Sequence, residues 1–191
     1  MNINTLMTTA CNLTHSAALR RIVAFLLLCN GLILDGAEIS FLKKGRVRFG
    51  SAAETAAALA RADPFVEAMS PFDRSARLKS RAPVSSAQFQ AFVGKQALEW
   101  DELEVARFSE VLRRIERTLE PFRLRLPAEI LLGKTTGEEE GQAAYCRSTN
   151  VVIIPEGKAT GSPEALQGLL AHELFHILSR NDLEVRDAIY G

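Results

Sequence analysis

The fold is decided by residues 142–179, which read QAAYCRSTNVVIIPEGKATGSPEALQGLLAHELFHILS. Two short apolar runs, 142–146 and 151–154, flank a polar turn and predict an antiparallel hairpin. The Ser-Pro pair at 162–163 is typical of an N-cap and a first helical position, so we expect a helix over 163–179. This stretch therefore predicts a small antiparallel sheet that directly precedes a helix.

Helices are also predicted upstream of this stretch. The Ala-rich segment 50–61 is expected to form a short helix, because alanine has the highest helix propensity. Residues 70–86 hold prolines and several arginines and predict an extended or looped connection. A serine cap at Ser85 or Ser86 predicts a further helix that runs to about Leu98.

The clearest helix is expected over 101–119, because apolar side chains recur every three or four residues with charges between them. This apolar stripe is expected to face the core, and it consists of Trp100, Leu103, Phe108, Val111, Leu112, Ile115 and Leu119. Beyond this helix, the short apolar run 129–133 predicts one more strand.

These patterns predict an α+β fold class, with N-terminal helices, then a small antiparallel sheet, then the helix over 163–179. The chain has 191 residues, enough for one core of ordinary size, and we expect a single domain over 38–191. Hydrophobic residues make up 47% of the chain and charged residues 24%, a balance typical of soluble globular domains. The 23 basic and 23 acidic side chains cancel, so we expect no nucleic-acid partner.

The N-terminal segment predicts an export signal. A pair of arginines at 20–21 precedes the apolar run 22–34, which is shorter than the roughly 20 residues of a membrane-spanning helix. We therefore interpret residues 1–37 as a signal peptide or hydrophobic anchor, with a membrane tether through 22–34 in the second case. The protein is then exported (periplasmic or secreted) or membrane-anchored. The alternative is a buried N-terminal helix of the domain.

Cysteine usage gives little guidance about the compartment. Cys11, Cys29 and Cys146 are too few and too widely spaced for a disulfide framework.

The helix over 163–179 contains the motif His172-Glu-Leu-Phe-His176. Two histidines four residues apart lie on one face of a helix, so their imidazoles can converge on one ion at the roughly 2.0–2.1 Å of zinc–nitrogen bonds. Glu173 can reach a metal-bound water and take its proton, because zinc lowers the pKa of that water toward about 7. The alternative is a pair of helical histidines that hydrogen-bond to each other, with a solvated glutamate between them.

Residues 127–180, with the hairpin, the helix and this motif, resemble the zincin metallopeptidases. In that group an antiparallel strand at the edge of a small sheet precedes the active-site helix and binds peptide by main-chain pairing. The resemblance implies a zinc cofactor held by His172 and His176, a peptide or protein substrate, and peptide-bond hydrolysis with Glu173 as general base.

A third metal ligand is expected from the resemblance, but fifteen residues follow His176 and the gluzincin glutamate lies further downstream. Glu184 ranks first among the local candidates, ahead of Asp182 and Asp187. Asp182 has the metzincin spacing, but the glycine that those enzymes need is replaced by a serine at 179. A cysteine ligand from an upstream strand, as in peptide deformylases, would be Cys146.

Three functions follow from these residues. The first is a zinc-dependent metallopeptidase, in which Tyr145 is either an oxyanion donor or a buried structural residue. The second is an inactive or truncated zincin relative that binds metal or peptide without turnover; the sequence stops at Gly191, partway through a predicted helix, which favours truncation. The third is a membrane-tethered interaction protein in which the histidine pair is incidental.

Overall fold

A computed structural model of the chain describes residues 37–43 and 45–191. The predicted leader over 1–37, apart from Ala37, lies outside the described residues, and so does the candidate tether 22–34. In the part of the chain that the structure describes, no helix combines the length and the apolar character needed to cross a bilayer.

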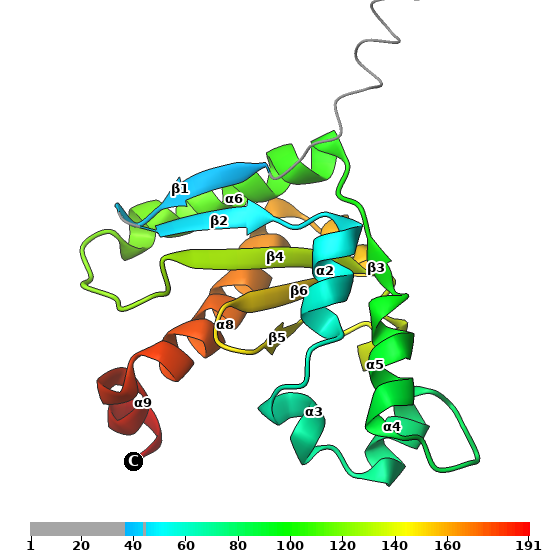
Figure 1. Cartoon of the computed structure of the whole chain (residues 1–191). Coiled ribbons are helices and arrows are strands. Elements are labelled where there is room, and N and C mark those ends of the chain that lie inside the picture. The colour runs from blue at the N-terminus through cyan, green and yellow to red at the C-terminus, as the bar shows by residue number, and fades with distance from the viewer. Residues whose placement is uncertain (1–36, 44) are drawn as a thin grey trace, which may run out of the picture. The chain divides into compact units, whose positions relative to one another are not determined.

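A mixed sheet forms the middle layer of the described residues (Figure 1). Its strands lie in the order β1-β2-β4-β6-β5, and β3 pairs with β4 off this path. The strand bounds are β1 (Glu38–Phe41), β2 (Gly45–Phe49), β3 (Ala97–Leu98), β4 (Glu129–Thr135), β5 (Tyr145–Arg147) and β6 (Val151–Pro155). The three inner strands, β2, β4 and β6, run parallel, whereas β1, β3 and β5 pair antiparallel with their neighbours.

The α+β class is confirmed, but the prediction of an antiparallel sheet preceded only by helices is wrong. The sheet begins with the β1–β2 hairpin, ahead of every described helix. Its parallel pairs join distant segments, with Arg46 opposite Glu129 and Leu131 opposite Val151. The β5–β6 hairpin is antiparallel as predicted, with Tyr145 opposite Ile153.

The described residues form eight α-helices and one short 3-10 turn. The bounds are α2 (Ala52–Leu59), α3 (Pro64–Ala68), α4 (Pro71–Arg77), α5 (Ser86–Gly94), α6 (Glu102–Leu119), η1 (Glu138–Glu140), α7 (Glu156–Ala159), α8 (Pro163–Asn181) and α9 (Leu183–Tyr190). Most predicted helices are confirmed, with serine or aspartate side chains at their N-caps.

Two of these helix predictions need correction. The predicted connection over 70–86 contains α4, because Pro71 occupies the first helical turn and Ser70 forms a capping box with Asp73. The helix predicted to reach Leu98 ends at Gly94, and Leu98 belongs to β3.

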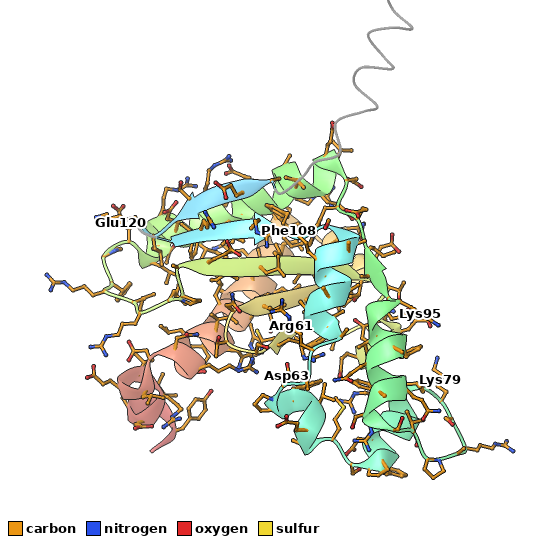
Figure 2. All side chains as sticks on the ribbon, viewed as in Figure 1. Arg61, Asp63, Lys79, Lys95, Phe108 and Glu120 are labelled. Atoms are coloured by element: carbon orange, nitrogen blue, oxygen red, sulfur yellow. The ribbon has the colours of Figure 1, made fainter. Side chains whose placement is uncertain are left out.

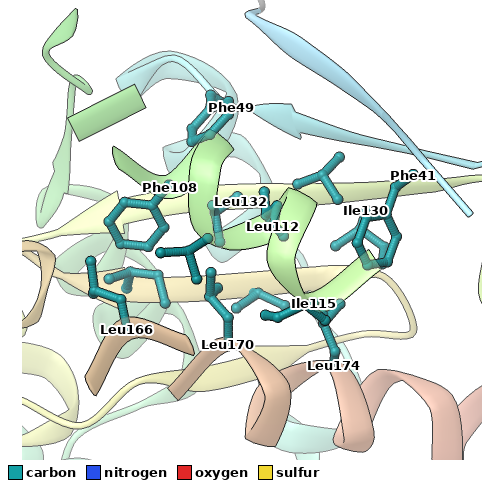
Figure 3. Packing of buried hydrophobic residues seen from close by; sticks show 14 of the residues in the cluster. Phe41, Phe49, Phe108, Leu112, Ile115, Ile130, Leu132, Leu166, Leu170 and Leu174 are labelled. Carbon is teal, nitrogen blue, oxygen red and sulfur yellow. The ribbon is translucent and has the colours of Figure 1, made fainter. Parts of the chain in front are cut away.

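Helices cover both faces of the sheet. Helices α6 and α8 pack on one face, and α2 lies on the other with α5 beside it (Figure 1). Phe108 of α6, labelled in Figure 2, is fully buried in the core between α6, α8 and the sheet, which Figure 3 shows from close by. Leu103 departs from the predicted core stripe: it is 77% exposed in the first turn of α6.

Side chains of each strand alternate between these two layers, as the pleat requires. On β4, Ile130 and Leu132 belong to the core under α6 and α8, whereas Leu131 faces α2 and α5. On β5, Cys146 belongs to the α6–α8 core, and Tyr145 packs against the core under α2 and α5. Consecutive residues of this edge strand therefore contact different layers.

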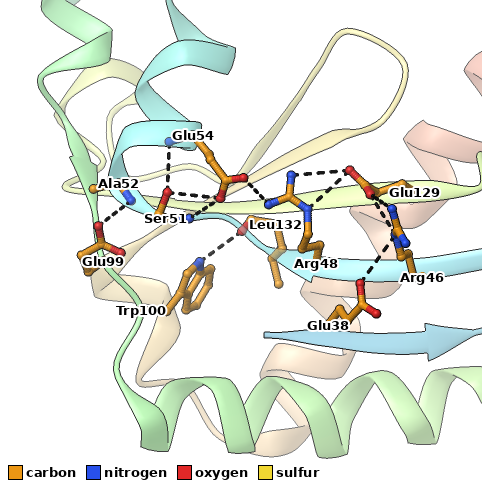
Figure 4. Close-up of polar contacts among 10 residues, drawn as sticks. All are labelled: Glu38, Arg46, Arg48, Ser51, Ala52, Glu54, Glu99, Trp100, Glu129 and Leu132. Atoms are coloured by element: carbon orange, nitrogen blue, oxygen red, sulfur yellow. Dashed lines mark hydrogen bonds and ion pairs between the residues drawn. The ribbon is translucent and has the colours of Figure 1, made fainter. Parts of the chain in front are cut away.

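Polar contacts fix α2 to the parallel strands (Figure 4). The Arg48 guanidinium on β2 bridges the carboxylates of Glu54 on α2 and Glu129 on β4. Nearby, the Trp100 indole N–H donates to the Leu132 carbonyl at 3.1 Å. The α2 layer is thereby held in a fixed position over the sheet.

Candidate metal and general-base site

Helix α8 carries the predicted site, and its position is set by its ends and its buried stripe. The Ser162 side chain accepts from the Ala165 N–H, and Pro163 occupies the first turn. Four apolar side chains spaced three or four apart pack against α6 and the sheet: Leu166, Leu170, Leu174 and Ile177. Glu173 therefore borders this stripe and contacts β5, whereas His172 and His176 lie further round the helix, toward solvent.

The two histidine rings are in contact in an edge-to-face arrangement. Their Nε2 atoms are 3.0 Å apart, with ring centroids at 4.6 Å and ring planes nearly perpendicular. His172 is exposed and His176 is half-buried. Two tetrahedral zinc ligands at roughly 2.1 Å would lie about 3.4 Å apart, so a small rotation of either ring fits the pair to one ion. The same distance suits a hydrogen bond between the rings, which is the alternative that the sequence left open.

The Glu173 side chain is buried. Its residue surface is 3% exposed, and its Oε2 accepts from the Cys146 Sγ at 3.1 Å. The same sulfur lies 3.4 Å from the Glu173 carbonyl oxygen. This thiol is the one hydrogen-bond donor to the Glu173 carboxylate within the described residues. A thiol is a weak donor, so this bond replaces water only poorly at Oε2.

Cys146 acts in this pair as a protonated donor. Burial raises the pKa of the Cys146 thiol well above its usual range, and the charge and hydrogen bond of Glu173 raise it further. The sulfur is therefore engaged with Glu173 as a neutral thiol, whereas metal ligation requires a thiolate. The arrangement favours a positioning role for Cys146 over the ligand role considered from the sequence.

The candidate third ligands lie at the start of α9. The Glu184 side chain is 79% exposed and forms an ion pair with the Arg125 Nη2 at 3.2 Å. Asp182 is buried and caps α9 by accepting from the Val185 N–H at 3.3 Å. Asp187 is paired with the Arg186 guanidinium of its own helix. Within residues 37–43 and 45–191, no three His, Cys, Asp or Glu side chains are grouped so that they could hold a metal ion.

Tyr145 faces away from α8. Its hydroxyl donates to Glu139 Oε1 at 3.0 Å, and its ring stacks on Phe65 with centroids 6.1 Å apart. Burial raises the pKa of the Tyr145 phenol well above its usual range. These contacts lie on the α2–α5 side of the sheet, so they support the structural reading of this tyrosine over an oxyanion role.

Two hydrogen bonds at the C-terminal end of α8 are not predicted from the sequence. The Arg180 Nη1 donates to the Ser148 carbonyl at 2.8 Å, and the Asn181 Nδ2 donates to the Thr149 carbonyl at 2.7 Å. Both bonds tie the end of α8 to the β5–β6 turn. They join residues more than thirty positions apart, and a tertiary contact at such separation leaves no periodic signal in the sequence.

Comparison of the chain with protein-family models, with curated proteins and with solved structures yields no match. The function is therefore argued from the geometry of the site itself.

Proposed function

We propose that this chain is a zinc-dependent peptidase, in which His172 and His176 hold the metal and Glu173 is the general base. One observation carries the proposal: two imidazoles converge at the surface of α8, and Glu173, the residue that follows His172, is buried with a weak thiol as its one donor among the described residues. A glutamate that directly follows the first of two histidines four residues apart on a helix is the arrangement of metal-dependent hydrolases.

In the proposed hydrolysis, the metal, Glu173 and Cys146 have different roles. When bound, zinc lowers the pKa of a coordinated water toward about 7. Glu173 is the residue type suited to take a proton from a water and to return it to the leaving amine. The Cys146 thiol orients that carboxylate through Oε2. The buried apolar stripe of α8 keeps the sheet side of the site free of water.

An extended peptide is the substrate that suits the neighbouring strand. Strand β5 is the last in the strand order, and among the described strands it pairs with β6 alone. Its outer edge offers main-chain donors and acceptors to an added strand, which is a recurring mode of peptide binding. Because Cys146 of β5 contacts Glu173 of α8, a peptide on this edge lies close to the proposed base.

A second candidate is a relative that binds metal or peptide without turnover. It is favoured by the position of Glu184, the first-ranked third ligand, whose carboxylate is engaged with Arg125. Metal binding by two histidines alone is weaker than by three ligands, so zinc would then be retained only at raised zinc concentration.

The test uses the full chain, purified under metal-replete conditions and examined for zinc by elemental analysis. We expect about one zinc per chain, and its loss in His172→Ala. Glu173→Gln should keep the zinc and reduce cleavage of an unstructured protein substrate by roughly 10²-fold or more. Glu164→Gln, a substitution of an exposed glutamate on the same helix, serves as the matched control and should leave cleavage unchanged.

The outcomes separate the candidates. Zinc retained without cleavage in the wild-type chain would favour the binding protein. A chain that holds no zinc after metal-replete purification would contradict both.

A further inference from the structure

Arg180 extends the row of side chains that begins with His172 and His176. Each of the three is four residues from the next, so all three lie on one flank of α8. The rise of an α-helix places Arg180 about 6 Å along the axis from His176. A guanidinium therefore stands one turn beyond the histidine pair.

The Arg180 guanidinium is held in place without being neutralised. Its Nη1 donates to the Ser148 carbonyl at 2.8 Å, while the residue remains exposed. No ion pair among the described residues involves Arg180, whereas the neighbouring Arg186 is paired with Asp187 at 2.8 Å. Arg180 thus combines a fixed position with an uncompensated charge and with N–H groups that are available to a ligand.

A cavity opens beside Arg180, between the end of α8 and α9. It is lined by Ser179, Arg180, Arg186, Asp187, Tyr190 and Gly191. The Tyr190 ring lies 6.4 Å from the Phe175 ring, which in turn lies 6.4 Å from the His176 ring. These aromatic contacts connect the cavity to the histidine pair along the surface of α8.

Strand β5 and the turn that follows it contact α8 at two places. Cys146 of β5 contacts Glu173, and Ser148, which follows β5, contacts Arg180. A peptide extended along the β5 edge advances about 3.3 Å per residue, so the 6 Å between His176 and Arg180 correspond to about two residues.

We infer that Arg180 and this cavity bind a carboxylate of the substrate, about two residues from the cleaved bond. This inference rests on the proposed peptidase function and names the substrate class of the same site. The carboxylate is either the side chain of an acidic residue or the C-terminal carboxylate of a short peptide. Both present two oxygens that match the planar donors of a guanidinium.

The experiment compares cleavage of peptide pairs by the full, zinc-loaded chain. One set carries Glu or Gln at each of the three positions on either side of a common cleavage site. A second set carries a free acid or an amide at the C-terminus. We expect the preferred acid to raise kcat/KM by about tenfold over its neutral partner, the lower end for a hydrogen bond to a charged group. The pair that shows the ratio identifies the source of the carboxylate.

Variants then assign the ratio to Arg180. Arg180→Met should bring it close to one, Arg180→Lys should keep part of it, and Arg180→Glu should invert it in favour of a basic residue. Arg113→Met, which removes an exposed arginine of α6, is the matched control and should leave the ratio unchanged. The ratio is measured within each variant, so a general loss of folded protein does not move it.

Failure of this inference is distinct from failure of the proposed function. Two results overturn the carboxylate site but leave the peptidase function intact. In the first, the wild-type chain cleaves peptides without preferring the acidic one. In the second, the ratio of kcat/KM for acidic and neutral peptides is unchanged in Arg180→Met. If no peptide is cleaved, binding of the same fluorescent peptides by the chain is measured. Acid-selective binding that Arg180→Met removes supports the site without turnover, and absence of such binding overturns it together with the peptidase.

Discussion

Buried carboxylates contact strand β5 on both of its sides, and two of them, Asp63 and Glu173, have very different hydrogen-bond partners. On the α2 side, Asp63 accepts from the Arg147 Nε at 2.7 Å, from the Ser148 N–H at 3.2 Å and from the Val66 N–H at 3.1 Å. On the α8 side, Glu173 accepts from the Cys146 thiol and from no other donor in the described part of the chain. Cys146 and Arg147 are neighbours in the chain, so one edge strand supplies both partners.

The difference in hydrogen-bond partners between Asp63 and Glu173 indicates that Asp63 has a structural role. Burial raises the pKa of Asp63, but the hydrogen bonds and charge of Arg147 and the Val66 N–H outweigh it, so the pKa is lowered overall. Asp63 is thus satisfied as an ion, and it caps α3 through the Val66 bond (its place beside Arg61 is labelled in Figure 2). Glu173 has no cation paired with it within the described residues, so nothing comparable to Arg147 compensates this carboxylate.

The largest expected effect on the free energy of unfolding comes from removing one partner of the buried Arg147–Asp63 ion pair. Arg147→Met leaves Asp63 buried without its cation, and Asp63→Asn leaves the guanidinium without its anion. Each should lower the free energy of unfolding by about 3–5 kcal/mol, measured by urea denaturation at pH 7. Because the pKa of Asp63 is lowered by folding, the stabilisation is present above the unfolded pKa of about 3.9 and is lost as pH falls below it. Equal stability of Arg147→Met and wild type would show that the pair is not structural.

A smaller effect, of the opposite sign, is expected at Glu173. Glu173→Gln replaces a poorly compensated charge by a neutral amide of the same shape, so the metal-free chain should be unchanged or more stable by up to about 1 kcal/mol. The measurement is the same urea denaturation, in the presence of a chelator. A loss as large as that of Asp63→Asn would contradict the comparison, because it would place Glu173 among the structural carboxylates.

The smallest expected effect concerns Cys146 at alkaline pH. Folding raises the pKa of its thiol, so the stabilisation is complete below the unfolded thiol pKa of about 8.5 and is lost as pH rises above it. In a Cys11→Ser, Cys29→Ser background, the stability difference between the parent and Cys146→Ala should shrink by about 1 kcal/mol between pH 7.5 and 9.5. A pH-independent difference would mean that the thiol does not remain protonated in the folded chain.

The local parts of this fold could be predicted from the sequence, and the pairing of its strands could not. Helix α8 has a cap, a proline in its first turn and a regular apolar stripe, and all three signals lie within its own residues. Strands β1 and β2 are short and carry charges at several positions, so they lack the apolar run that marks β4 and β6. The parallel register of β2 with β4 joins residues some eighty positions apart, and no local pattern encodes it.

The same division holds in the site. The spacing of four residues predicts that His172 and His176 lie together, because helix geometry alone decides it. The Cys146–Glu173 contact depends on how β5 packs against α8. A single arginine near a helix end is ordinary, so no sequence pattern distinguishes Arg180. The metal itself and the third ligand stay predictions.

The side chains of β5 point alternately to the two helical layers, so inserting or deleting a residue in this short strand should be poorly tolerated. Shifting its register by one residue turns every side chain to the opposite layer. Arg147 would then face Glu173 and Cys146 would face Asp63, so the cation would neutralise the proposed base while the structural aspartate lost its partner. We expect single-residue insertions or deletions between Tyr145 and Asn150 to be far more damaging than most substitutions there, although the turn lies at the surface.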